Sequence, residues 1–271
     1  MSPCIAFIGG GNMAGAIIGG LRRAGLPAED LLVVEPVAAQ RERLAAEFGV
    51  SPLAAADASL ARAQAVVWAV KPQLFQEAAV PVAPWVGQAL QLSVMAGLRS
   101  EAIAAAVGAA RVVRGMPNTP ALIGQGITGL YARDEVTADD RALVARILQP
   151  TGRSVWVDRE ADLDTVTALS GSGPAYFFFV IEHLVAAAQA LGLSEPQARE
   201  LALATCGGAA ALAQHSGEPP SVLREKVTSK GGTTHAAISS LQADGVGQAV
   251  ERAVQAAHRR ARELGDEFGR V

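Results

Sequence analysis

Cys4-Ile-Ala-Phe-Ile-Gly-Gly-Gly-Asn-Met-Ala14 is the stretch that decides the fold of this chain. Its first five residues predict a short apolar strand, and the apolar residues from Ala16 to Leu21 recur at helical spacing. Gly9, Gly11 and Ala14 fit the pattern G-x-G-x-x-G/A, in which the first glycine makes a tight turn and the second admits a pyrophosphate. This strand–turn–helix setting favours a dinucleotide site over a glycine-rich turn in another kind of α/β protein.

Further apolar runs extend this pattern along the first half of the chain. The run Leu31–Glu35 predicts a second strand, and it ends in the acid that dinucleotide sites place about 20 residues after the glycines. Additional strands are predicted at Ala65–Val70, Leu90–Val94, Arg111–Met116 and, at an edge, Ser154–Val157. Strands that alternate with helices predict a doubly wound parallel sheet of the Rossmann α/β class.

Four loops follow the predicted strands, and we expect them to surround one crevice, because ligands of such sheets bind beyond the carboxyl ends of the strands. These loops are Gly9–Met13, Ala69–Pro72, Met95–Gly97 and Pro117–Pro120. For Lys71, a cofactor contact is favoured over a free surface position. Asn118 lies between two prolines and is a candidate to hydrogen-bond a nicotinamide or a substrate. Ser100 is predicted to cap the helix that follows the third loop.

Composition excludes several classes of function. The chain has 271 residues, and its formal net charge of −3, without a basic run, gives little support to nucleic-acid or membrane-surface binding. Cys4 and Cys206 are the only cysteines, so neither a disulfide framework nor a metal site is expected. We see no signal peptide, and the most apolar run, Ala175–Ile181, is too short to cross a bilayer. These features predict a cytoplasmic protein.

From Glu160 onward, only helical patterning is found. We therefore predict a dinucleotide-binding domain at 1–160 and a helical domain at 161–271, with a helix break at Ser170–Pro174. The segment Ala175–Leu191 is apolar around most of its circumference and must be buried on most faces. The helical domain is too small to bury it alone, so we expect its helices to interlock with those of a second chain.

A second glycine-rich stretch, Val227-Thr-Ser-Lys-Gly-Gly-Thr-Thr-His235, lies between two predicted helices. Its glycines let backbone N–H groups converge on a ligand, and the following helix directs its positive end to the same place. This favours a small anion site, for instance for a carboxylate. The alternative is a glycine turn with a hydroxyl residue as N-cap, and local chemistry alone slightly favours it.

Together these segments resemble the pyrroline-5-carboxylate reductase family over nearly the whole chain. The first glycine motif is shared with many dehydrogenases, whereas the match in the last segment is highly specific for this family. The segments that carry the resemblance are Phe7–Ala14, Ala69–Pro72, Arg114–Pro120, Ser170–Tyr176 and Leu223–Gln242.

The resemblance implies NAD(P)H-dependent reduction of the cyclic imine 1-pyrroline-5-carboxylate to L-proline, the last step of proline biosynthesis. It also implies a Rossmann domain followed by an all-α C-terminal domain that forms a homodimer by interlacing. Dimers of this family often assemble further into rings.

Carried over residue by residue, the resemblance implies two sets of contacts. The cofactor would be held by Ile8, Gly9, Gly10, Gly11, Asn12 and Met13, by Ala69, Val70, Lys71 and Pro72, and by Met95, Ala96 and Gly97. The substrate carboxylate would be held by Ser229, Gly231, Gly232, Thr233 and Thr234. The Thr234 hydroxyl would donate a proton to the ring nitrogen. Hydride addition to an imine carbon draws charge to nitrogen, so this chemistry needs a proton donor and close positioning rather than a strong base.

Two positions depart from expectation. Lys230 stands where the family usually has proline, and it either adds a cation near the carboxylate or is only solvated. Glu35 favours a ribose 2′-hydroxyl and repels a 2′-phosphate, whereas many relatives prefer NADPH. Both NADPH and NADH therefore remain possible cofactors.

Two other functions compete with this interpretation. A 2-hydroxyacid dehydrogenase of 6-phosphogluconate-dehydrogenase-like type would need a catalytic lysine in mid-chain, just after Gly171–Gly173. The three lysines, Lys71, Lys226 and Lys230, all lie elsewhere. A non-catalytic, cofactor-binding regulatory protein is the second alternative, and the intact hydroxyl residues of the second glycine-rich stretch argue against it.

Overall fold

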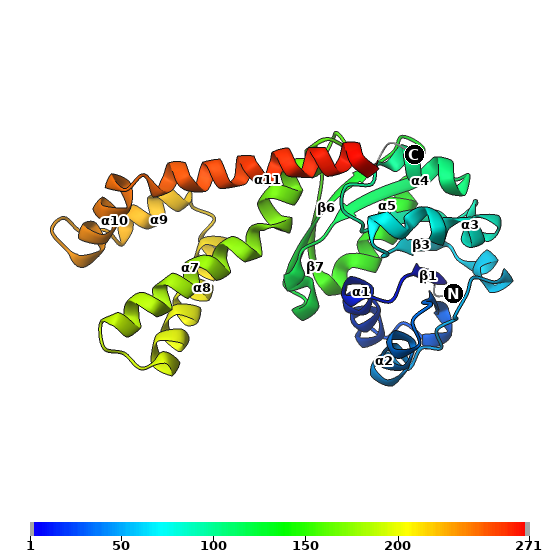
Figure 1. The fold of residues 1–271 in the computed structure, drawn as a ribbon, viewed down its shortest axis with the longest axis horizontal. Coiled ribbons are helices and arrows are strands. Elements are labelled where there is room, and N and C mark those ends of the chain that lie inside the picture. The colour runs from blue at the N-terminus through cyan, green and yellow to red at the C-terminus, as the bar shows by residue number, and fades with distance from the viewer. Residues whose placement is uncertain (1–2, 269–271) are drawn as a thin grey trace. The chain divides into compact units, whose positions relative to one another are not determined.

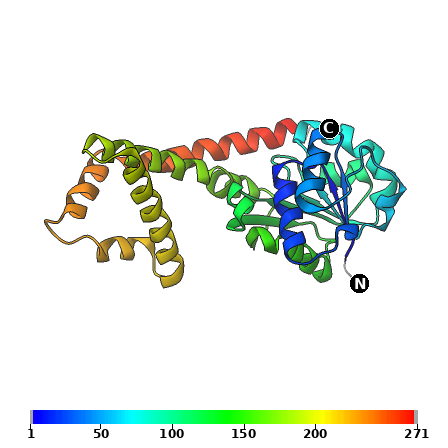
Figure 2. The ribbon, with the colours of Figure 1, turned by 90° about the horizontal axis from the view of Figure 1, so that it is seen from below.

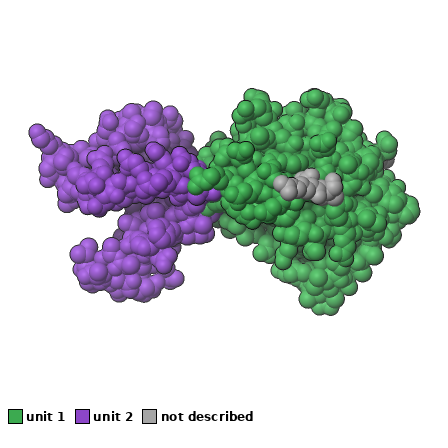
Figure 3. All heavy atoms as spheres, turned by 45° about the horizontal axis from the view of Figure 1, so that its top comes forward, with its two compact units in different colours: residues 1–172, 257–271 green, residues 173–256 purple. Residues whose placement is uncertain are grey.

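The computed structural model describes residues 3–268 and shows two compact units, drawn in different colours in Figure 3. The first unit comprises the chain up to Ser172 together with the C-terminal residues from Ala257 onward. The second unit is Gly173–Ala256. None of the helices in the described part of the chain is long and apolar enough to cross a membrane.

The first unit is built on a central sheet (Figures 1 and 2). This sheet has seven strands in the order β2-β1-β3-β4-β5-β6-β7. The strands are β1 (Ile5–Ile8), β2 (Leu31–Val34), β3 (Ala65–Trp68), β4 (Leu90–Ser93), β5 (Val112–Met116), β6 (Gly126–Ala132) and β7 (Gly152–Trp156). All neighbours are parallel except β5 and β6, which pair antiparallel. The predicted Rossmann class is confirmed, and β7 is the predicted edge strand. The sheet is mixed rather than parallel throughout, because β5 and β6 are antiparallel, and β6 was not among the predicted strands.

Helices cover both faces of the sheet, and each face has its own apolar core. The helices of this unit are α1 (Asn12–Arg23), α2 (Ala38–Phe48), α3 (Phe75–Val86), α4 (Ser100–Val107), α5 (Ala138–Leu148) and α6 (Asp162–Val166), with the end of α11 (Val246–Phe268). On one face, Phe7 packs with residues of α1, α2 and α5 such as Ile17, Leu44 and Val144. On the other face, Trp68 packs with α3 and α4. Because successive side chains of a strand point to opposite faces, β1 contributes to both cores.

The second unit contains only helices, as predicted. They are α7 (Gly173–Ala190), α8 (Glu195–Ser216), α9 (Pro220–Lys226), α10 (Thr233–Ala243) and the part of α11 up to Ala256. The change from alternating strands and helices to helices alone falls between β7 and α6. The predicted helix break at Ser170–Pro174 is smaller than expected, because a π-helical turn, Thr167–Gly171, joins α6 almost directly to α7.

Very few residues of the second unit are buried in one chain. In α7 and α8 the buried residues are Gly173, Ala198 and Ala202. Phe177, Phe178 and Phe179 are each more than 60% exposed, which is unusual for large apolar side chains that lie side by side in a folded protein. Helices α7 and α8 therefore present a continuous apolar surface that one chain does not cover.

Candidate active site

The crevice predicted from the sequence lies where the order of the strands reverses. Strand β1 pairs with β2 on one side and with β3 on the other, and β3, β4 and β5 continue as parallel neighbours. The carboxyl ends of these strands therefore lie along one edge, as the sequence predicted for the four loops. In an open α/β sheet this reversal point is where a dinucleotide binds.

Gly9 begins the first glycine loop, Gly9–Gly11, and brings two of these strand ends together. Its backbone has φ +95°, and a Cβ there would lie 2.8 Å from the carbonyl oxygen of Ala69, which follows β3. Only glycine combines that conformation with so close an approach. The end of β1 and the predicted cofactor contact at Ala69 are thus held against each other.

Gly11 is the N-cap of α1, and this helix start lacks a side-chain cap. A Cβ at Gly11 would have no atom within 4 Å, so the space beside it is open to a ligand. The first N–H groups of a helix have no acceptor within the helix, and they attract anions such as a pyrophosphate. This end of α1, with Asn12 and Met13 in its first turn, fits the phosphate group of a dinucleotide.

The peptide group of Gly10 is held from both sides by the segment that follows β2. Its N–H donates to Glu35 Oε2 (2.7 Å), and its carbonyl oxygen accepts from Arg43 Nη2 (2.9 Å). The other oxygen of Glu35 accepts from the N–H of Val37 (2.8 Å). Glu35 is only 7% exposed. The structure therefore gives Glu35 a supporting contact beneath the loop, and its contact with a ribose stays a prediction.

A cavity of about 360 Å³ adjoins the first glycine loop. Ile8, Gly9 and Val70 of the predicted cofactor residues line it. The rest of the apolar lining was not predicted from the sequence and includes Pro36, Ala54, Ala55, Ala56, Leu74 and Ala78. Ala54–Ala56 reach the cavity because Leu53 pairs with Val34 at the end of β2, a long-range contact without a signal in the sequence. An apolar cavity of this size suits the flat adenine end of a dinucleotide, so the residues present fit this cofactor.

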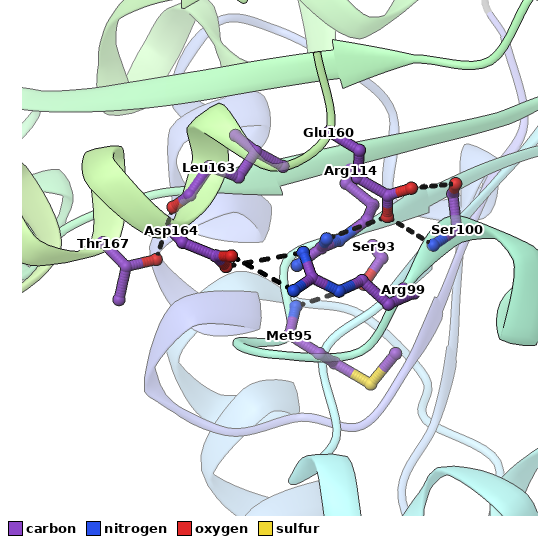
Figure 4. Close-up of polar contacts among 9 residues, drawn as sticks. All are labelled: Ser93, Met95, Arg99, Ser100, Arg114, Glu160, Leu163, Asp164 and Thr167. Carbon is purple, nitrogen blue, oxygen red and sulfur yellow. Dashed lines mark hydrogen bonds and ion pairs between the residues drawn. The ribbon is translucent and has the colours of Figure 1, made fainter. Parts of the chain in front are cut away.

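The third loop, Met95–Gly97, lies beside a network of charged side chains (Figure 4). Arg99 Nη2 lies 3.1 Å from Asp164 Oδ2, and Arg114 Nη1 lies 2.8 Å from Glu160 Oε1. Glu160 also accepts from the N–H (2.6 Å) and the hydroxyl (2.8 Å) of Ser100. Ser100 is therefore not the N-cap predicted from the sequence; Arg99 is the N-cap residue of α4. The Ser100 hydroxyl instead donates to the carboxylate of Glu160, which lies 60 residues further along the chain.

Burial and charge act in opposite directions on Glu160. Burial alone would raise the pKa of its carboxyl, but the Arg114 guanidinium and the hydrogen bonds from Ser100 and Arg114 hold this pKa below its ordinary value. Burial in turn lowers the pKa of Arg114, against the effect of Glu160. The ion pair joins β5 to the segment that leads into α6.

Lys71 and Asn118 occupy the remaining strand ends. Lys71 is exposed after β3, immediately before the short 3₁₀ helix Pro72–Leu74. The side-chain oxygen of Asn118 accepts from the N–H of Ile127 (3.0 Å), so in this structure it supports the start of β6. Their contacts with a cofactor stay predictions.

The second glycine loop, Ser229–Gly232, precedes α10 in the second unit. Gly231 has φ +77°, and the N–H of Gly232 closes the turn by donating to the carbonyl of Ser229 (3.0 Å). Gly232 itself is the N-cap of α10, without a side-chain cap. The alternative of a hydroxyl N-cap is thus wrong, and Thr233 and Thr234 lie in the first turn of the helix.

The two sets of predicted ligand contacts belong to different parts of the chain. Every predicted cofactor residue lies in the first unit, and every predicted substrate residue lies in the second. Among the residues described, no group of three or more His, Cys, Asp or Glu side chains is placed to hold a metal ion.

Comparison with known proteins decides the family. The pyrroline-5-carboxylate reductase of Pseudomonas aeruginosa is 44% identical over 270 residues, which cover 99% of both chains. This chain belongs to the pyrroline-5-carboxylate reductase family. Residues 160–264 match the family model described as pyrroline-5-carboxylate reductase dimerisation, and residues 4–97 match the model described as NADP oxidoreductase, coenzyme F420-dependent.

Solved structures of this family have the same fold. The reductase of Coxiella burnetii superposes with a TM-score of 0.91 at 35% identity, covering 97% of this chain and 99% of the other. The pyrroline carboxylate reductase of Plasmodium falciparum, solved with NADP bound, superposes with a TM-score of 0.86 at 27% identity, covering 97% and 98%. The expected enzyme class, an NAD(P)H-binding pyrroline-5-carboxylate reductase of proline biosynthesis, is confirmed.

Proposed function

We propose that this chain reduces 1-pyrroline-5-carboxylate to L-proline by a mechanism in which the second glycine loop holds the substrate and Thr234 donates the proton. The observation that carries this proposal is the start of α10, where a glycine N-cap leaves the first N–H groups without a side-chain acceptor. This start lies within the segment Leu223–Gln242, whose sequence is the most specific for the family.

The substrate carboxylate is the natural ligand of this helix start. The N–H groups of the first turn, including those of Thr233 and Thr234, point along the helix axis, and the positive end of the helix dipole favours an anion there. The Ser229 hydroxyl lies over the same turn, because a Cβ on Gly232 would be 2.8 Å from its Oγ. A carboxylate bound by these groups would fix the ring of the imine relative to the helix.

The first glycine loop and its apolar cavity are the proposed cofactor site. Gly9–Met13 would hold the pyrophosphate, and Ala69–Pro72 and Met95–Gly97 would line the nicotinamide end, with Glu35 and Asn118 in supporting positions. When bound, NAD(P)H supplies the hydride that the imine carbon receives. The protein's contribution is to hold the reacting groups about 3–3.5 Å apart and to exclude water.

Thr234 would complete the reaction by protonating the ring nitrogen. Hydride addition to the imine carbon leaves an electron pair on nitrogen, and one proton from a hydroxyl donor balances the reaction to the amine. Thr234 is the second residue of α10, in the same first turn that would hold the carboxylate, and it is only partly exposed.

The exposed apolar surface of α7 and α8 supports a homodimer through the second unit, in line with the match to the dimerisation model. Assembly of such dimers into a larger ring is part of the same proposal. Both cysteines are free, which suits the reducing cytoplasm in which we expect the enzyme to act.

Oxidation of NADPH and of NADH on addition of 1-pyrroline-5-carboxylate tests this function directly. Absence of turnover by the wild-type chain with both cofactors would refute it. In an active enzyme, we expect Thr234→Ala to lower kcat by about 100-fold or more, because a positioned proton donor contributes about 10²–10⁴-fold.

Thr234→Ser is the matched control, since it keeps the hydroxyl and removes one methyl group. It should retain most of the turnover, and both variants should bind NADPH like the wild type. Equal kcat values for Thr234→Ala and the wild type would remove Thr234 from the mechanism.

A further inference from the structure

Arg99 lies where both segments that connect the two units meet the Met95–Gly97 loop. The chain leaves the first unit after Ser172 and returns to it at Ala257. Shortly before it leaves, α6 provides Asp164, whose two carboxylate oxygens lie 3.1 and 3.5 Å from the two terminal nitrogens of Arg99. After it returns, α11 provides Gly265, where a Cβ would lie only 2.6 Å from Arg99 Nη2 and 3.0 Å from Cζ. The guanidinium is therefore held between an aspartate of one segment and the bare backbone of the other.

The backbone of the loop itself also contacts the returning segment. A Cβ on Gly97 would lie 3.0 Å from the ring of Phe268 and 3.4 Å from the carbonyl carbon of Leu264, and Gly97 has φ +78°. Met95 at the start of the loop is buried. The loop thus has almost no free space on the side of α11, and its position depends on where the end of that helix lies.

A second anchor holds the residue that follows Arg99. Glu160, two residues before α6 begins, accepts from both the N–H and the hydroxyl of Ser100 and pairs with Arg114. The side chains of Arg114 and Asp164 are each only 5% exposed. Removing one partner of a buried ion pair leaves a charge without compensation, so the network favours one arrangement strongly over others.

We propose that Arg99 is a positioning residue that fixes the Met95–Gly97 loop to both segments connecting the two units. This inference rests on the proposed function in one respect, namely that the loop lines the nicotinamide. Arg99 does not line the adenosine-sized cavity, so its loss should affect placement of the reacting end of the cofactor more than binding of the other end.

The first test needs neither cofactor nor activity. Hydrogen–deuterium exchange of peptides that span Met95–Ser100 is compared in the full-length wild type and in the Arg99→Ala variant. We expect exchange at least about 10-fold faster in the variant, because the loop loses its contact with both segments. Arg111→Ala is the matched control, since Arg111 pairs with Asp140 (2.6 Å) at the opposite end of β5 and should leave this peptide unchanged.

The second test separates positioning from general stability. We expect Arg99→Ala to lower kcat by about 10- to 100-fold, with a change of less than about threefold in the Kd for NADPH measured by fluorescence, because a 1 Å misplacement can cost about 10²-fold. Arg99→Lys keeps the charge but loses the two-nitrogen contact, so it should recover only part of kcat. Arg111→Ala should stay within about twofold of the wild type in both quantities.

A double-mutant cycle tests whether Gly265 acts through Arg99. As a single substitution, Gly265→Ala should displace the guanidinium and cause part of the kcat loss that Arg99→Ala causes. Combined with Arg99→Ala, it should lower kcat little further. Unchanged exchange at Met95–Ser100 in Arg99→Ala, unchanged kcat, or fully additive effects of the two substitutions would each overturn the proposal. A wild type without reductase activity would refute the proposed function, whereas the exchange experiment would still decide whether Arg99 holds the loop.

Discussion

The two glycine loops of this chain have similar local chemistry, but the packing and hydrogen bonds that hold them in place differ greatly. Gly9–Gly11 and Ser229–Gly232 each precede a helix whose N-cap is a glycine without a side-chain cap. The first loop lies at the edge of a buried sheet, and Glu35 and Arg43 hold its central peptide. The second is largely exposed and lies between helices whose apolar faces are uncovered in one chain.

This difference shows that a local motif determines which backbone donors are offered to a ligand but not what holds them in place. The first unit contains both apolar cores found in the described part of the chain, so its loop is rigid within one subunit. The second unit lacks an equivalent core. We therefore expect its loop to take a fixed position only when a second subunit covers α7 and α8.

A charged residue introduced into the exposed apolar surface of α7 and α8 should therefore have the largest effect, because it should prevent dimer formation. We expect Phe178→Asp to raise the dimer dissociation constant by at least about 100-fold, because each buried phenylalanine contributes about 1.5–3 kcal/mol and a two-fold interface contains it twice. Sedimentation should show monomers at micromolar concentration, and circular dichroism should show loss of helix from the second unit. NADPH binding by the first unit should be retained.

Val80→Asp is the matched control for this substitution. Val80 is 73% exposed on α3 of the first unit, where the subunit has its own core, so the change should leave the dimer intact. A Phe178→Asp chain that stays dimeric, or a wild-type chain that sediments as a stable folded monomer at micromolar concentration, would contradict the proposed interface.

Substitution of Glu35 should have an intermediate effect, confined to the first loop. Glu35→Ala leaves the buried N–H of Gly10 without its acceptor, which should cost about 1–3 kcal/mol of stability and weaken cofactor binding by about 10-fold. The two cofactors separate the two roles of this residue. If Glu35 only supports the loop, Kd for NADH and NADPH will rise by the same factor; if it binds the ribose 2′-hydroxyl, the loss will fall on NADH alone. Titration of protein fluorescence with each cofactor measures both values.

The parts of the structure that followed from the sequence are those determined by neighbouring residues. The strand–turn–helix at Gly9 is an example, since it depends only on residues that are close together in the chain. Strand β6 was missed because Gly126 and Gly129 weaken its strand signal. Gly129 is needed there because a Cβ would lie 2.6 Å from Val166 of α6, a contact that cannot be read from the strand itself.

Long-range contacts also explain what the sequence did not show at the site. Glu160 and Asp164 had no role predicted from the sequence, yet they bind Ser100 and Arg99 across about 60 residues of chain. The apolar cavity at Ala54–Ala56 depends likewise on pairing with β2. The family resemblance identified the residues that face ligands, whereas the residues that hold them became visible only in the fold.

Substitution of Lys230 should have the smallest effect on the enzyme. It tests how far substrate binding by the second loop depends on the side chains of the loop itself. Lys226 nearby pairs with Glu218 at 2.7 Å, whereas Lys230 is exposed and forms no ion pair within residues 3–268. If this free charge attracts the substrate carboxylate, Lys230→Pro and Lys230→Gln should both raise the KM for 1-pyrroline-5-carboxylate by about two- to fivefold, since exposed charges contribute about 0–1 kcal/mol. The increase should shrink as ionic strength rises, because salt screens such attraction. If KM rises in the Lys230→Pro variant but not in Lys230→Gln, the effect belongs to the backbone of the turn. If KM is unchanged in both variants, Lys230 is only solvated, and the loop is held entirely by its glycines and by the second subunit.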